Sequence, residues 1–115
     1  MNEEVIKKGK TIISDPDYIY SMYDFSVIWI NEDIYEKYGF NSMHKESLTL
    51  FDIFEMPQSK TNQLILESAQ SEITELTLSI VGKGKCNVKT KNINFRYDGE
   101  LFRVGKILKI KNCKK

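Results

Sequence analysis

The sequence predicts an α+β fold, in which a five-stranded antiparallel sheet has helices packed on one face. Strand-like alternation of apolar residues occurs twice, at residues 18–30 and at residues 73–110, and between these stretches apolar residues recur at helical spacing. The chain has 115 residues, of which 41% are hydrophobic, so it is long enough for one domain with its own core. The expected order of elements is β-β-α-α-α-β-β-β.

An N-terminal helix is expected at residues 1–13. Acidic residues stand near its start, where the positive end of the helix dipole favours them, and apolar residues recur every seven positions in the pairs Val5/Ile12 and Ile6/Ile13. This helix either docks on the domain's own surface or forms the edge of a helical contact with a second chain. Since Pro16 breaks it, we divide the chain into a helical extension at 1–13, a core domain at 14–112 and a basic tail at 113–115.

The core domain opens with a predicted β-hairpin. Residues 18–23 are rich in Tyr and Ile, Asp24-Phe25-Ser26 is turn-like, and residues 27–30 form a β-branched and aromatic run. Asn31 follows at once and predicts a side-chain N-cap for a short helix that ends at Gly39.

A helical middle and three further strands complete the predicted fold. Apolar residues at 48–54 have the spacing of brief helical turns, and residues 59–72 predict one longer helix. After residue 73 the chain alternates as strands do, with turns at 82–85 and at Asp98-Gly99. These three strands and the first hairpin supply the five strands of the sheet.

Several short motifs follow one another along the core domain. Asp24 is followed by Asn31 at the end of a strand and then by Gly39-Phe40, and the same stretch of chain holds Ser14-Asp15-Pro16-Asp17, Leu50-Phe51-Asp52-Ile53 and Asp98-Gly99. The joint spacing of these motifs over residues 14–111 resembles that of the PAS family of sensory domains. The resemblance implies the PAS fold, whose order of elements agrees with the order that periodicity predicts.

The resemblance also implies a function. We expect a cytoplasmic sensory or interaction domain of a signal transduction protein, for example a sensor histidine kinase of a two-component system. Such a domain would act through homodimerisation, with or without a small ligand, and without catalysis. The alternative is a small-molecule-binding or enzymatic α+β pocket protein that has no signalling role.

Three departures from the family pattern limit what its members imply for this chain. The last strand does not end in the Asp-Ile-Thr stretch that hands a signal to an output helix. The cysteine motif of flavin-binding PAS photosensors is missing, and residues 59–72 hold no histidine of the kind that binds haem in other members. We therefore expect neither haem nor flavin, and the cofactor stays unknown.

Candidate ligand-binding residues lie where ligand-binding PAS domains hold small molecules, between the long helix and the sheet. Ser68 is small enough to leave room on the helix, while Thr90, Asn92 and Asn94 share one face of a strand and could offer hydrogen bonds. The competing arrangement buries the residues that alternate with them, namely Ile93, Phe95 and Tyr97. We favour this apolar, ligand-free core, which would send the Asn pair to solvent or to a partner chain.

Other functional classes find little support in the sequence. A formal charge of +1 gives no global attraction to nucleic acid, and no apolar run approaches the ~20 residues of a membrane span. His44 is the sole imidazole and lies in a polar loop, and Cys86 and Cys113 are far apart in sequence, so no metal site is expected. Gly82-Lys83-Gly84-Lys85 lacks the spacing of a phosphate-binding loop, and no catalytic constellation is visible.

Overall fold

The computed structural model describes residues 2–37, 48–55, 73–80 and 85–114 of the chain. In chain order their elements are α1 (Asn2–Ile12), β1 (Tyr18–Ser21), β2 (Val27–Ile30), α2 (Glu32–Lys37), α3 (Leu50–Ile53), β3 (Phe54–Glu55), β4 (Ile73–Ile80), β5 (Lys85–Tyr97) and β6 (Glu100–Lys114). The predicted helix at 59–72, with Ser68, lies outside the described residues, as do His44, Gly39 and most of the predicted turn at 82–85.

The described strands form one antiparallel sheet in the order β2-β1-β6-β5-β4-β3. This sheet has six strands where the sequence predicted five. The additional strand is β3, two residues long, in which Phe54 pairs with Ile80 of β4. So short a strand has no periodicity of its own, and only its pairing with β4 reveals it.

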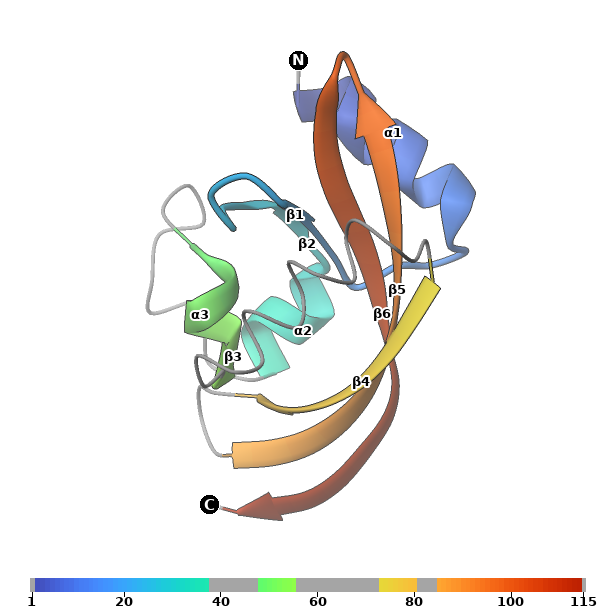
Figure 1. Cartoon of the computed structure of the whole chain (residues 1–115). Helices are drawn as coiled ribbons and strands as arrows, with labels where there is room; N and C mark the ends of the chain where they lie inside the picture. The colour runs from blue at the N-terminus through green and yellow to red at the C-terminus, as the bar shows by residue number, and fades with distance from the viewer. Residues whose placement is uncertain (1, 38–47, 56–72, 81–84, 115) are drawn as a thin grey trace.

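The long β5–β6 hairpin forms the middle of the sheet and curves strongly along its length (Figure 1). Its two-residue turn is Asp98-Gly99, with φ values of 51° and 81°, and it brings Tyr97 opposite Glu100. Positive φ at both turn positions matches the twist of the flanking strands, and Asp and Gly tolerate that geometry. The predicted hairpin turn is confirmed.

Helices cover the described sheet on both of its faces, so the prediction of helices on one face is wrong. Figure 1 shows α1 on one side of the β5–β6 hairpin and α2 and α3 on the other side. We call the side with α1 the outer face, where Val5 and Ile13 pack with residues of β1, β5 and β6: Ile19, Phe95, Phe102 and Val104. The spacing within α1 predicts a helix but does not say which surface it covers.

α1 is therefore part of the core cluster, which favours the first of its two predicted roles, docking on its own domain. It lies so close to the sheet that a Cβ at Gly9 would stand 2.6 Å from Cδ1 of Ile19. At the other end of the chain, β6 runs to Lys114, so the backbone at 113–114 continues the strand rather than starting a separate tail.

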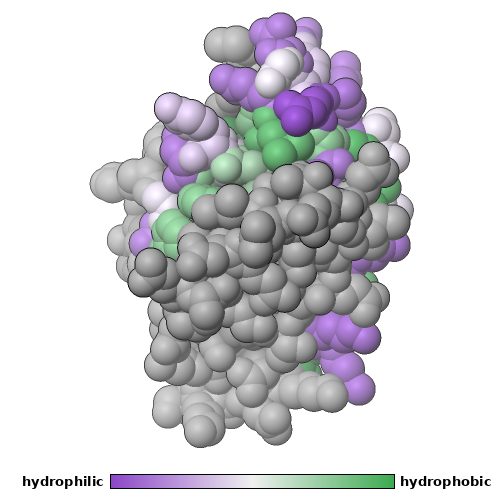
Figure 2. All heavy atoms as spheres, viewed as in Figure 1, coloured by the Kyte–Doolittle hydropathy of each residue, from purple (hydrophilic) through white to green (hydrophobic). Residues whose placement is uncertain are grey.

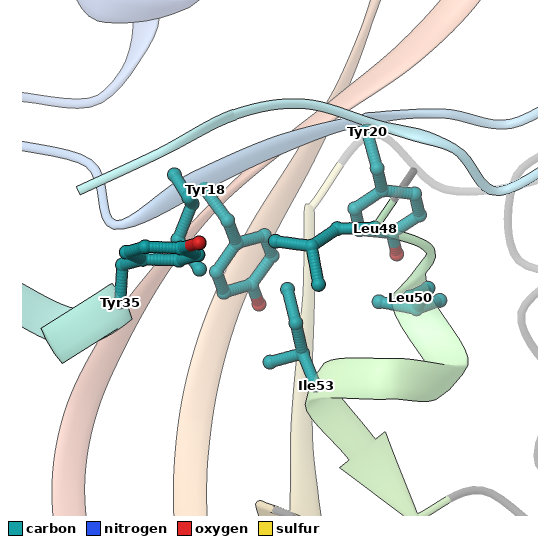
Figure 3. Close-up of a cluster of buried hydrophobic side chains, with 7 residues drawn as sticks. Tyr18, Tyr20, Tyr35, Leu48, Leu50 and Ile53 are labelled. Atoms are coloured by element: carbon teal, nitrogen blue, oxygen red, sulfur yellow. The ribbon is translucent and has the colours of Figure 1, made fainter. Parts of the chain in front are cut away.

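The opposite side of the sheet, which we call the inner face, meets α2 and α3. Its buried cluster joins Tyr18 and Tyr20 of β1 to Tyr35 of α2 and to the segment that holds α3 (Figure 3), which contributes Leu48, Leu50 and Ile53. The predicted N-cap is confirmed, because the Asn31 side-chain oxygen accepts a hydrogen bond from the Asp33 amide at 2.9 Å. This cap starts α2 directly after β2 and so places Tyr35 in the cluster.

Figure 2 shows one face of the molecule, where hydrophilic residues lie at the upper end with apolar residues directly beneath them. Further hydrophilic residues lie along the right side of the same view. Large exposed apolar side chains are few among the described residues, and Tyr23 in the β1–β2 turn is the most exposed of them at 91%. In the part of the chain that the structure describes, no helix has both the length and the apolar character that a membrane crossing requires.

Candidate functional site

The candidate site is the inner face of β1, β6 and β5, where strand register aligns polar residues in rows. Tyr18 of β1 pairs with Gly105 of β6, which in turn pairs with Asn92 of β5. The neighbouring row joins Tyr20, Arg103 and Asn94 in the same way. Because side chains two residues apart lie on one face of a strand, both rows belong to the inner face.

Gly105 allows the first row to close across three strands. A Cβ at this position would overlap with the ring and hydroxyl of Tyr18, so the tyrosine lies over the β6 backbone where a side chain would otherwise stand. Its hydroxyl thereby reaches past β6 and donates a hydrogen bond to Oδ1 of Asn92 at 2.6 Å. A glycine in mid-strand here marks a close approach of a side chain to the backbone.

The hydrogen bonds continue from Asn92 along β5. Its side-chain amide nitrogen donates to the hydroxyl oxygen of Thr90 at 3.0 Å, and both residues are buried, with exposed fractions of 2% and 0%. Burial raises the pKa of the Tyr18 hydroxyl well above its ordinary value of 10.0, so this group stays protonated and remains a donor. The inner face thus holds a buried polar network in place of a wholly apolar layer.

Arg103 supplies the buried charge of the second row. Its exposed fraction is 0%, and its Nε donates a hydrogen bond to Oδ1 of Asn94 at 2.6 Å. The terminal nitrogens Nη1 and Nη2 are also buried, and they have no hydrogen-bond partner among the described residues. A buried charge with unused donors is energetically costly, which makes this guanidinium the least expected feature of the sheet.

The structure combines parts of the two arrangements predicted for β5. Thr90, Asn92 and Asn94 lie on the inner face, and Asn92 is buried. The alternating set that includes Phe95 packs on the outer face against α1. The prediction that burying this apolar set would send the Asn pair to solvent or to a partner chain is wrong for Asn92, because α1 covers the outer face while α2 and α3 pack on the inner one.

Sequence reasoning missed Arg103, although a signal for it was present. The Asp98-Gly99 turn sets the register of the β5–β6 hairpin, and counting outward from it brings residue 103 opposite Asn94. Phe102 and Val104 flank Arg103 and belong to the outer face, so alternation assigns the arginine to the inner face.

Two further polar features lie outside the inner face. Asp17 links the start of β1 to β6, since its Oδ2 accepts a hydrogen bond from the Ile107 amide at 2.7 Å, and burial raises the pKa of this carboxyl.

An open groove of about 600 Å³ runs between α1 and the start of α2, where the ammonium of Lys10 stands 4.6 Å from the Trp29 ring centroid. The described residues include no group of three or more His, Cys, Asp or Glu side chains arranged to hold a metal ion.

Comparison with known proteins supports the fold. No protein-family model matches the chain, and no curated protein sequence matches it. A crystal structure of the PAS domain of an HTR-like protein from Haloarcula marismortui is similar to this chain, with a TM-score of 0.61 over 92% of this chain and 93% of that one. The two sequences are 11% identical, so the likeness shows a shared fold. The PAS resemblance in the sequence is confirmed at the level of a PAS-like α+β fold.

Proposed function

We propose that the chain is a sensory domain of a signal transduction protein, which binds a small molecule against the inner face of its sheet. The observation that carries this proposal is the buried network of Tyr18, Asn92 and Thr90 on that face. An apolar layer would stabilise the fold at lower cost in desolvation, whereas directional polar groups can recognise a ligand. The PAS-like fold, shared with a PAS domain of an HTR-like protein, supports the sensory class.

In this proposal, a ligand bound on the inner face changes the outer face, where a partner chain would bind. Along β1, β5 and β6, residues that would contact a ligand alternate with residues that pack against α1. A ligand that changes the twist of these strands would therefore also change how α1 packs on the outer face. A ligand shifts this equilibrium only by binding one arrangement more tightly than the other. α1 would then present the changed surface to a second copy of the chain, in a cytoplasmic homodimer that performs no catalysis.

The alternative function is a small-molecule-binding or enzymatic pocket protein without a signalling role. The buried polar network favours it as much as it favours the sensory domain, because both need a ligand on the inner face. The two functions differ in one respect: binding should change the docking of α1 only in the sensory domain.

Native mass spectrometry of freshly purified protein tests the ligand. We expect a retained organic mass that denaturing conditions remove, and Asn92→Leu should lose it because the central residue of the network is gone. Arg96→Leu is the matched control, since it changes an exposed position on the same strand. A clean apo mass, together with no thermal shift from a panel of neutral and charged metabolites, would contradict the proposal.

Hydrogen exchange then separates the two functions. With the retained compound added back to ligand-free protein, the sensory function predicts altered protection of the amides of α1, on the face of the sheet away from the ligand. Protection confined to β1, β5 and β6 would favour the pocket protein. Light scattering at several concentrations, with and without the compound, measures the expected homodimer.

A further inference from the structure

The guanidinium of Arg103 is buried, and only one of its three nitrogens is hydrogen-bonded in the described structure. Its Nε donates a hydrogen bond to Asn94, which fixes the plane of the guanidinium. Nη1 and Nη2 are buried away from solvent, and their N–H groups have no acceptor in the part of the chain that the structure describes. A guanidinium presents its donors in a fixed planar arrangement that matches the two oxygens of a carboxylate. A structural role would have paired these donors with carbonyl or carboxylate oxygens of the chain.

The charges on the inner face favour a ligand with a single negative charge as the partner of Arg103. Buried polar or charged side chains among the described residues are Thr90, Asn92 and Arg103, and the arginine alone carries a charge. Tyr18, which lies in the adjacent row, remains neutral because burial raises its pKa. One negative charge would therefore neutralise the site, whereas a phosphate dianion would leave an excess negative charge buried.

The residues around Arg103 also indicate the chemical character of the rest of the ligand. Tyr20 is its register partner on β1, and the rings of Tyr18 and Tyr20 stack with centroids 5.9 Å apart. Figure 3 shows both rings on the side of β1 that faces Leu50 and Ile53. A ligand held at Arg103 would thus lay an apolar or aromatic body against these rings and side chains.

We infer that the ligand of the proposed sensory site is a small monocarboxylate with an apolar or aromatic body, and that Arg103 binds its carboxylate through Nη1 and Nη2. This inference rests on the proposed function, since it names the class of ligand for the same site. Asn94 is a positioning residue, because it holds the guanidinium through Nε.

Calorimetry and thermal denaturation with acetate, propionate and benzoate test the inference against acetamide, propionamide and benzamide. The amides keep the shape and lose the charge, and sodium chloride at equal ionic strength controls for salt. We expect benzoate to bind and raise the melting temperature, with benzamide at least about tenfold weaker, because a hydrogen bond to a charged group is worth this much in affinity. Arg103→Met should lose the benzoate shift, whereas Arg96→Met, at an exposed position, should keep it.

A second variant covers the case in which Arg103→Met does not fold. Asn94→Asp keeps the size of the side chain and places a carboxylate where Oδ1 now meets Nε. This internal counterion neutralises the guanidinium, so we expect Asn94→Asp to raise the melting temperature of the ligand-free protein and to abolish the preference for benzoate over benzamide.

The outcomes separate this inference from the proposed function. Equal affinity for benzoate and benzamide, an unchanged benzoate affinity in Asn94→Asp or Arg103→Met, or no binding by any of the three carboxylates would overturn the inference. If the protein still retains a neutral organic mass in native mass spectrometry, the proposed function stands while the carboxylate assignment fails. A clean apo mass with no response to any probe would remove both.

Discussion

The inner and outer faces of the sheet come from alternate residues of the same strands, yet they differ in chemistry. The outer face joins α1 to an apolar layer in which Phe95 and Phe102 stack with centroids 5.8 Å apart. The inner face is formed by the residues that alternate with these along each strand. It carries the Tyr18–Asn92–Thr90 network and the buried charge of Arg103. Both faces are covered, so the difference does not come from exposure to solvent.

This comparison separates stability from recognition within one sheet. Apolar burial on the outer face stabilises the fold in proportion to the area removed from water. Polar burial on the inner face contributes little net stability but leaves directional groups in a protected place. Substitutions on the two faces should therefore have different signatures, and the following experiments test that difference.

The largest loss of stability is expected on the outer face. Phe102→Ala removes a side chain that is 5% exposed and stacked on Phe95, and should lower the free energy of unfolding by about 3–5 kcal/mol. Urea denaturation measures this loss, with Tyr23→Ala as the exposed control, for which we expect a change within about 0.5 kcal/mol. If the two variants lost equal stability, the outer face would not be the stabilising layer.

The next largest effect is expected at Gly105, under the inner face. Gly105→Ala forces the Tyr18 ring off the β6 backbone and so breaks its hydrogen bond to Asn92, at a cost of about 2–3 kcal/mol. The same substitution in a Tyr18→Ala background should cost much less, because the overlapping ring is then absent. A double-mutant cycle measured by urea denaturation gives this coupling, and additive losses would show that the ring does not lie over Gly105.

A smaller effect is expected for the hydroxyl that reaches across the sheet. Tyr18→Phe leaves Oδ1 of Asn92 buried without its donor and should cost about 1–2 kcal/mol of unfolding free energy. A loss indistinguishable from that of Tyr23→Phe, whose ring is exposed, would argue that Asn92 finds another partner.

The same pair of variants gives the expected pH dependence. Burial raises the pKa of Tyr18 in the folded protein above its ordinary value of 10.0, so the unfolded chain releases this proton first as the pH rises. The contribution of Tyr18 to stability is therefore complete below about pH 10 and is lost progressively above it. Melting temperatures from about pH 9 to pH 11 should fall more steeply for the parent chain and Tyr23→Phe than for Tyr18→Phe.

Local sequence signals determined several elements of this fold. Asn31 predicts its own cap, Asp98-Gly99 predicts its own turn, and the alternation of Asn92 with Ile93 predicts that polar and apolar residues of β5 lie on opposite faces. Each of these features depends on interactions within a few residues, so the sequence contains the information directly.

The tertiary structure alone decided which face of the sheet each helix covers. A period of two residues separates two faces without saying which one points inward, because that depends on where α1, α2 and α3 pack. α1 buries the apolar face of β5, so the polar face of β5 lies on the inner face of the sheet. There Arg103 is buried, and Gly105 leaves space for the Tyr18 ring. Burial and register across three strands are long-range properties, since they arise from segments far apart in the chain.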